Sequence, residues 1–248
     1  MAEVENSKDL ISVLWSGADI LRSKMDANEY KDYLLGIVFY KYLSDSFLIK
    51  VYDLIYDERP ENLMVALDAY REALEDESAG ELQEQLRSEF HYVIEPELTY
   101  TCFADEARNN AFQREQLQKA FNNIEQSDPL FADLFTDIDL YSNRLGTGDQ
   151  KQSDTIANLI LEIDKADLLD SDAEILGNAY EYLIGQFASE TGKKAGEFYT
   201  PQAVSKILTK IAIAGQEDKK GLSVYEIKTI RLIQRYDTHR QQNMFKTA

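Results

Sequence analysis

The stretch from Tyr30 to Leu43 constrains the fold more than any other part of the chain, because it is apolar on almost every side of a helix. One face carries Tyr30, Tyr33, Leu34, Ile37 and Val38, and the remaining faces carry Leu35, Phe39, Tyr40, Tyr42 and Leu43. A helix that is apolar all round is stable in water only when other elements cover it. The pattern therefore predicts a mainly α-helical protein in which residues 8–142 form one bundle around this helix.

The ends of the first two helices are marked by capping residues. Ser7 is a candidate N-cap for a helix that continues to about Met25, with Leu14 and Leu21 on its apolar face. Asp26 precedes Glu29 by three residues, an arrangement typical of a capping box at the start of the central helix. The pair Arg59-Pro60 should end that helix, because proline cannot continue it.

Further along the chain, apolar stripes predict helices around residues 61–78, 82–90, 112–124 and 156–163. The segment from Tyr92 to Phe103 is rich in β-prone residues and fits either a strand or a buried loop. The polar segment from Asn143 to Ser153 contains Gly146 and Gly148 and is interpreted as a flexible linker. We expect Ser153 to cap the helix that follows.

The charge of the chain is strongly acidic and unevenly distributed. The 45 acidic and 26 basic residues give a net charge of −19, which argues against direct binding of nucleic acid by the chain as a whole. Residues 1–216 carry −22, whereas the tail from residue 217 carries +3, with seven basic residues against four acidic ones. Any contact with DNA should be local or supplied by a partner.

The residues that could bind metal or form disulfides are few. Cys102 is the single cysteine, so an internal disulfide cannot form and a reducing compartment fits. With only His91 and His239 as histidines, a Cys/His zinc site is not expected. The start of the chain lacks a basic segment before an apolar one, and no apolar run is long enough to cross a bilayer. We expect a cytoplasmic protein without a membrane segment.

The best candidate for a ligand site is the stretch that follows Gly196. Thr200 can serve as an N-cap and Pro201 fits the first helical position, so a helix should start here and continue through Val204 to Ile211. The N-terminus of a helix attracts anions, and Phe198 and Tyr199 add flat apolar faces beside it. These features suit a small molecule with a carboxylate and an aromatic ring, although an ordinary capped helix with two core aromatics explains the residues as well.

Two separated sets of residues resemble the modification (methyltransferase) subunit of type I restriction-modification systems. The first set comprises Leu14-Trp15, Ala18-Asp19, Leu21-Arg22, Met25-Asp26-Ala27, Glu29-Tyr30-Lys31 and Lys41-Tyr42-Leu43-Ser44-Asp45. The second comprises Ala179-Tyr180-Glu181-Tyr182-Leu183 and Gly196 to Pro201. The resemblance extends over about residues 8–225.

This resemblance implies an N-terminal helical domain followed by a Rossmann-like domain that methylates adenine N6 in DNA with S-adenosylmethionine. We accordingly expect a helical domain at residues 1–152, the helical beginning of the methyltransferase domain at residues 153–225, and a divergent basic tail at residues 226–248. By resemblance, the S-adenosylmethionine pocket is lined by Glu197, Phe198, Tyr199, Thr200, Pro201 and Gln202. The partners it implies are a specificity subunit, a second modification subunit and the restriction subunit, with DNA bound through the complex.

The sequence also departs from the pattern of this family. The family follows the strand that matches Val224-Tyr225 with Asp-Pro and a glycine-rich turn, whereas Glu226-Ile227 stands here. The four prolines never occur in a pair, so the catalytic Asn-Pro-Pro-Phe or Asn-Pro-Pro-Tyr is missing, and Asp128-Pro129-Leu130-Phe131 is better explained as a helix start. We interpret the chain as a truncated modification subunit that is inactive by itself; the alternative is a non-enzymatic acidic interaction module or DNA mimic.

Overall fold

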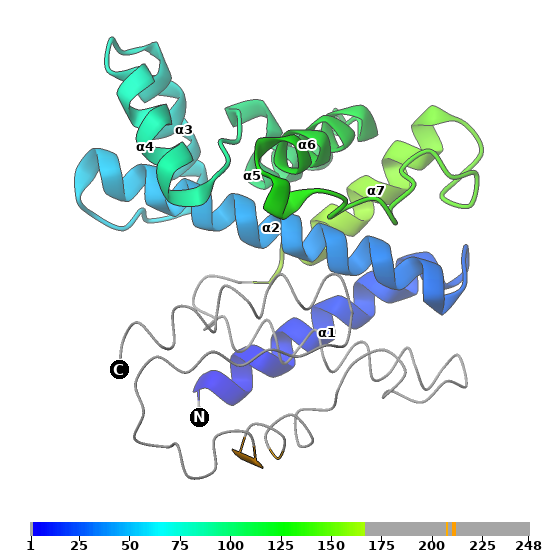
Figure 1. Ribbon diagram of the computed structural model, residues 1–248. Helices are drawn as coiled ribbons and strands as arrows, with labels where there is room; N and C mark the ends of the chain where they lie inside the picture. Colours follow the sequence, from blue (N-terminus) through cyan, green and yellow to red (C-terminus); the bar gives the residue numbers. More distant parts are fainter. Residues whose placement is uncertain (1, 167–206, 208–209, 212–248) are drawn as a thin grey trace. The chain divides into compact units, whose positions relative to one another are not determined.

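The computed structural model describes residues 2–166 together with residues 207, 210 and 211 (Figure 1). The regular elements of residues 2–166 are all helices, as the apolar stripes predict. They are α1 (Ala2–Arg22), α2 (Ala27–Tyr56), α3 (Leu63–Glu75), α4 (Ala79–Phe90), the 3₁₀ helix η1 (Pro96–Leu98), α5 (Tyr100–Arg108), α6 (Arg114–Ser127), the 3₁₀ helix η2 (Pro129–Phe131) and α7 (Asp149–Ile163). The prediction of a mainly α-helical fold is confirmed.

Helix α2 is the central element, as its all-round apolarity predicts. It contacts α1, α3, α4, α5 and α7, and Figure 1 shows it running beneath α3 to α6 with α1 on another side. Its buried side chains point in several directions, so that Leu34, Tyr40 and Phe47 are each fully covered. The surrounding helices thus remove from water the apolar surface that α2 could not expose alone.

Local capping sets the ends of α2. Asp26 and Glu29 form the predicted capping box, in which each side chain pairs with the backbone N–H of the other residue. At the other end Asp57 adopts a left-handed conformation with φ 56°, and the last helical residue is Tyr56. The predicted start is therefore confirmed, whereas the helix ends at the left-handed Asp57, before it reaches the Arg59-Pro60 pair.

Aromatic rings fill the space between α2 and the helices above it. The ring of Tyr40 lies 5.6 Å from Phe121 and 6.1 Å from Phe135 between centroids, both edge-on. Phe121 and Phe135 stack at 4.0 Å with nearly parallel planes. The Tyr40 hydroxyl donates a hydrogen bond of 2.6 Å to the Leu98 carbonyl, so the polar end of this buried ring is satisfied.

One local prediction is wrong, and another is decided between its two alternatives. Ser7 is not an N-cap, because α1 already begins at Ala2. The segment from Tyr92 to Phe103 is not a strand: it is a buried loop that contains η1 and leads into α5, which is the alternative that the sequence left open. Pro96 opens the 3₁₀ turn, and the Thr99 side chain caps α5 by accepting a hydrogen bond from the Cys102 N–H. Local capping thus outweighs the β-propensity of this segment.

The segment from Asn143 to Ser153 is also not a free linker. Leu145 is fully buried, and its carbonyl accepts hydrogen bonds from Lys24 Nζ at 3.1 Å and Thr155 Oγ1 at 2.7 Å. Ser153 does not cap α7, because the helix starts at Asp149 after the N-cap Gly148. The domain boundary predicted at residue 153 therefore falls inside α7, which packs against α1 and α5, and it stays a prediction together with the boundary at residue 226.

Candidate functional site

The sequence-predicted ligand site lies outside the part of the chain that the structure describes. This applies to all six of its residues, Glu197, Phe198, Tyr199, Thr200, Pro201 and Gln202, and to the tail at residues 226–248. Of the helix predicted to follow Pro201, the described residues Ile207, Lys210 and Ile211 are helical. The assignment of this stretch to a ligand site remains a prediction.

The peptide Asp128-Pro129-Leu130-Phe131 has the structural role that the sequence favours. The Asp128 carboxylate accepts a hydrogen bond of 2.8 Å from the Leu130 N–H and so caps η2, in which Pro129 occupies the first position. The same carboxylate lies 3.4 Å from His91 Nδ1, at the end of α4. The Asp128 carboxylate is therefore engaged in capping η2 and in contacting the end of α4.

The Gly-Thr-Gly segment before α7 is a helix start and not a phosphate-binding loop. Gly148 has φ +92°, a conformation that favours glycine, and serves as the N-cap. The first helical residue is Asp149, whose carboxylate lies 2.7 Å from Arg114 Nη2. The Asp149 carboxylate thus provides, from within the protein, the negative charge that a helix N-terminus favours.

A buried polar network is centred on the Lys41-Tyr42-Leu43-Ser44-Asp45 stretch of α2. The Lys41 ammonium lies 2.6 Å from Asp45 Oδ2, and the two side chains are only 4% and 1% exposed. The ammonium also lies 3.6 Å from Asp164 Oδ1, and Asp164 pairs with Arg108. One buried lysine thus joins α2 to the end of α7, while Arg108 adds the end of α5.

Tyr100 completes this network at the start of α5. Its backbone N–H donates a hydrogen bond of 2.8 Å to Ser44 Oγ, and its hydroxyl donates one of 2.8 Å to the Ile160 carbonyl of α7. The Lys41 ammonium lies 4.9 Å from the centre of its ring. Burial, and then the Asp164 and Asp45 charges, raise the pKa of the Tyr100 phenol well above its usual value, so the hydroxyl remains a proton donor.

A second ionic contact holds the start of α6 against the start of α7. Buried Arg114 donates hydrogen bonds to the Asp149 carboxylate at 2.7 Å and to its carbonyl at 3.1 Å, and its guanidinium lies 4.6 Å from the Tyr141 ring centre. Its backbone N–H donates to Ser153 Oγ at 3.3 Å. No local pattern indicates this contact, because Arg114 and Asp149 are far apart along the chain.

Within the described part of the chain, these networks position helices and form no reactive centre. The acidic and basic groups in them are paired with each other, and no group of three or more His, Cys, Asp or Glu side chains in the described residues could hold a metal ion. In the same part of the chain no helix is both long and apolar enough to cross a membrane. The Lys41–Asp45–Asp164 network fixes the end of α7, at the point where the described bundle ends.

Two family models match successive parts of the chain. Residues 10–163 match the model of the HsdM N-terminal domain family, and residues 171–229 match the model of the N-6 DNA methylase family. The first match covers α2 to α7 and most of α1, and the second contains the predicted ligand stretch from Gly196 to Gln202.

Several characterised proteins resemble the chain along most of its length. It is 30% identical over 220 residues to the type I restriction enzyme MpnII methylase subunit of Mycoplasma pneumoniae, and 31% identical over 209 residues to the MjaVIII methylase subunit of Methanocaldococcus jannaschii. These alignments cover 83% and 82% of this chain, but only 39% and 31% of the two relatives. The chain therefore spans well under half the length of the curated relatives it matches.

A solved structure agrees with the fold. The crystal structure of the type I restriction-modification system methyltransferase subunit from Streptococcus thermophilus superposes with a TM-score of 0.79 at 49% sequence identity. The match covers 87% of this chain and 46% of the other.

Proposed function

Because this chain belongs to the HsdM N-terminal domain family of type I restriction-modification methylase subunits, we propose that it serves such a system as part of its DNA-modifying component. The observation that carries the proposal is the succession of two family matches in one chain, the helical domain at residues 10–163 and the adenine-N6 methylase at residues 171–229. This succession favours a methylase subunit over the acidic interaction module or DNA mimic that the charge alone allowed.

The helical bundle and the methylase region have different roles in this proposal. The helical bundle supplies rigid surfaces for assembly, since its ionic networks hold α2, α5, α6 and α7 together. The methylase region supplies a wall of the S-adenosylmethionine pocket, for which we propose the Glu197 to Gln202 stretch. The helix start at Thr200 and Pro201 suits the cofactor's carboxylate, and Phe198 and Tyr199 suit its adenine ring.

The partners in this proposal are a specificity subunit and a second modification subunit, with the restriction subunit joining the complete complex. DNA is reached through that complex, because a net charge of −19 opposes direct binding by this chain. A cytoplasmic location belongs to the same proposal, since the DNA to be modified is there. The acidic surface favours a basic partner surface by electrostatic steering.

These 248 residues do not transfer a methyl group by themselves. They contain no Asn-Pro-Pro-Phe or Asn-Pro-Pro-Tyr to hold a flipped adenine, and no glycine follows Gly221 to form the cofactor's glycine-rich turn. The cofactor wall at Glu197 to Gln202 is one side of a pocket, so binding of S-adenosylmethionine by this chain alone should be weak.

Co-expression with the specificity subunit of the same system tests the assembly role. We expect the two to co-purify at low salt and to associate more slowly as the salt concentration rises, because ions screen the steering field. Deletion of residues 226–248 should leave the complex intact and is the matched control for the bundle. Failure to co-purify, or binding that requires the tail, would show that the bundle is not the assembly surface.

A methylation assay tests the catalytic part separately. Unmodified DNA is incubated with labelled S-adenosylmethionine and the purified chain, and no label should reach the DNA. Turnover without a partner polypeptide would refute the proposal of inactivity. The pocket wall is tested by photocrosslinking the labelled cofactor to the native chain and to a Phe198→Ala/Tyr199→Ala variant. Equal labelling of the two proteins would show that these residues do not line the pocket.

A further inference from the structure

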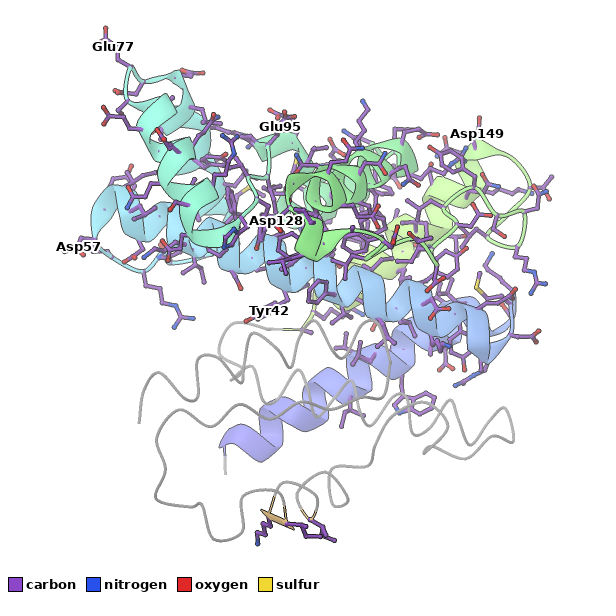
Figure 2. All side chains as sticks on the ribbon, in the orientation of Figure 1. Tyr42, Asp57, Glu77, Glu95, Asp128 and Asp149 are labelled. Atoms are coloured by element: carbon purple, nitrogen blue, oxygen red, sulfur yellow. The ribbon has the colours of Figure 1, made fainter. Side chains whose placement is uncertain are left out.

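The last turn of helix α7 carries negative charge at a place where a helix does not favour it. Asp164 is the C-cap, Glu162 stands in the last turn, and that turn holds no basic residue. Because the C-terminus of a helix has a partial negative charge of its own, a carboxylate there destabilises the helix unless a cation from elsewhere pairs with it. The opposite end differs, since Asp149, labelled in Figure 2, stands at the N-terminus of α7, where a carboxylate is favourable. The Asp164 carboxylate is therefore stabilised from outside α7.

Two cations from two other helices pair with this carboxylate. The Lys41 ammonium of α2 lies 3.6 Å from Asp164 Oδ1, and Arg108, the last residue of α5, pairs with Asp164 Oδ2 through Nη2. The Lys41 side chain is 4% exposed, whereas the Arg108 side chain is 52% exposed. Both oxygens of the Asp164 carboxylate are thus engaged, one by a buried cation and one by a solvated cation.

The Ile160 carbonyl marks the point up to which a different contact holds α7. It accepts a hydrogen bond of 2.8 Å from the Tyr100 hydroxyl of α5 and another of 2.8 Å from the Asp164 N–H. Residues 161–166, which follow this point, are called the terminal turn below. The turn has hydrogen bonds of its own, such as that of 3.0 Å from the Ala166 N–H to the preceding turn. Beyond the Tyr100 contact, the ion pairs of Asp164 tie the terminal turn to α2 and α5.

The terminal turn also lies where the two family matches meet. The match to the HsdM N-terminal domain ends at residue 163, and the match to the N-6 DNA methylase begins at residue 171. We propose that Asp164 is a latch: its ion pairs with Lys41 and Arg108 close the terminal turn onto the bundle, and the turn opens as a unit of its own when these ion pairs part. Local opening of this kind costs less free energy than unfolding of the whole bundle. The latch thereby sets how firmly the chain is held where it leaves the helical domain.

The alternative is that apolar burial alone holds the terminal turn. Ile163 is 0% exposed and Ala166 is 5% exposed, and their burial stabilises the closed turn whatever the charge of residue 164. The latch differs in one consequence: an uncharged side chain of the same shape in place of Asp164 frees the turn, although no apolar contact changes. Neither explanation depends on S-adenosylmethionine or on a partner subunit, so the outcome leaves the proposed function untouched.

The test measures amide hydrogen exchange of the complete 248-residue chain, with rates corrected for the intrinsic effect of each substitution. The variant Asp164→Asn removes the latch carboxylate. Its matched control, Glu162→Gln, removes a carboxylate of similar exposure, 19% against 22%, whose ion pair is with Lys165 of the same turn. We expect exchange in the terminal turn to become about tenfold faster or more in Asp164→Asn, and less than about threefold faster in Glu162→Gln, because only Asp164 pairs with other helices. Equal effects of the two variants would overturn the proposal.

The urea dependence of exchange in the native chain separates local opening from unfolding of the whole bundle. Exchange in the terminal turn should change little at low urea concentrations, because local opening exposes little surface. Amides earlier in α7 that exchange only through unfolding of the bundle should accelerate steeply under the same conditions. If the terminal turn shows the same protection and the same steep urea dependence as those amides, it does not open by itself and the proposal fails.

A double-mutant cycle tests the pairing of Asp164 with Arg108. Because the Arg108 side chain is 52% exposed, Arg108→Gln leaves no fully buried charge behind. In the Arg108→Gln background, Asp164→Asn should accelerate exchange in the terminal turn by a smaller factor than in the native chain, since one of the two cations that stabilise the carboxylate is absent. Equal factors in the two backgrounds would show that Arg108 is not part of the latch and would overturn the proposal. Circular dichroism of each variant verifies that the bundle is folded.

Discussion

The Lys41 ammonium and the Asp45 carboxylate lie 2.6 Å apart on successive turns of α2, and both side chains are almost completely buried. A second lysine–aspartate pair on the same helix, Lys50 and Asp53, has a similar distance of 2.9 Å but is 30% and 44% exposed. The two pairs thus have similar chemistry in different surroundings. A buried charge without its counter-ion is costly, whereas an exposed one is solvated by water.

The first prediction follows from this contrast. Asp45→Asn should lower the free energy of unfolding by about 3–5 kcal/mol, because it leaves the Lys41 ammonium buried with only the more distant Asp164 carboxylate. The matched substitution Asp53→Asn on the solvent side should cost less than about 1 kcal/mol. Urea unfolding followed by circular dichroism measures both. Equal costs would show that the buried pair contributes no more than the exposed one.

The second prediction concerns close packing at Gly36 of α2. A Cβ atom added at this position would overlap the side chain of Ile138, with Phe135 next in contact, whereas one added at Gly80 of α4 would meet nothing within 4 Å. Gly36 lies in the middle of α2 and Gly80 is the second residue of α4, so alanine gains more helix propensity at Gly36 and the difference in stability is a lower bound on the steric cost. Gly36→Ala should be less stable than Gly80→Ala by about 1–3 kcal/mol in thermal or urea unfolding. Equal stability of the two variants would mean that the Ile138 side chain moves aside without a cost in free energy.

The third prediction is a pH dependence that arises from Asp32. Burial raises the pKa of this carboxyl from 3.8 to about 6, against an opposing effect of the neighbouring Lys31 and with a further increase from Asp137. Because the folded state binds the proton more tightly than the unfolded state, the stabilisation by the protonated carboxyl is complete below pH 3.8 and is lost as the pH rises through about 6.

The measurement compares the native chain with Asp32→Asn by urea unfolding from pH 4 to pH 7. Relative to the variant, the free energy of unfolding of the native chain should fall by about 1–2 kcal/mol from pH 4 to pH 7. This is less than the energy equivalent of the whole pKa shift, because the side chain is partly solvated. Asp137→Asn should reduce the loss, since it removes a negative charge that raises the pKa of Asp32. If the difference in free energy of unfolding between the native chain and Asp32→Asn stays constant with pH, the titration does not belong to Asp32.

The sequence by itself determined the elements whose causes are local. All-round apolarity identified α2 as the central helix, and the three-residue spacing of Asp26 and Glu29 identified its capping box. The resemblance carried by Lys41 to Asp45 and by Gly196 to Pro201 pointed to the family that the comparisons then supported. Periodicity, capping and short motifs are properties of neighbouring residues, so they can be read along the chain.

Only the tertiary structure decided what depends on residues that are distant in sequence. Leu145 is buried and hydrogen-bonded by Lys24 and Thr155, so a polar, glycine-containing stretch that the sequence predicted as a linker is a packed part of the bundle. Similarly, the sequence does not show that the Lys41 ammonium lies 3.6 Å from the Asp164 carboxylate and 4.9 Å from the centre of the Tyr100 ring. Burial and long-range pairing arise from how helices meet, and no local pattern encodes which helices meet.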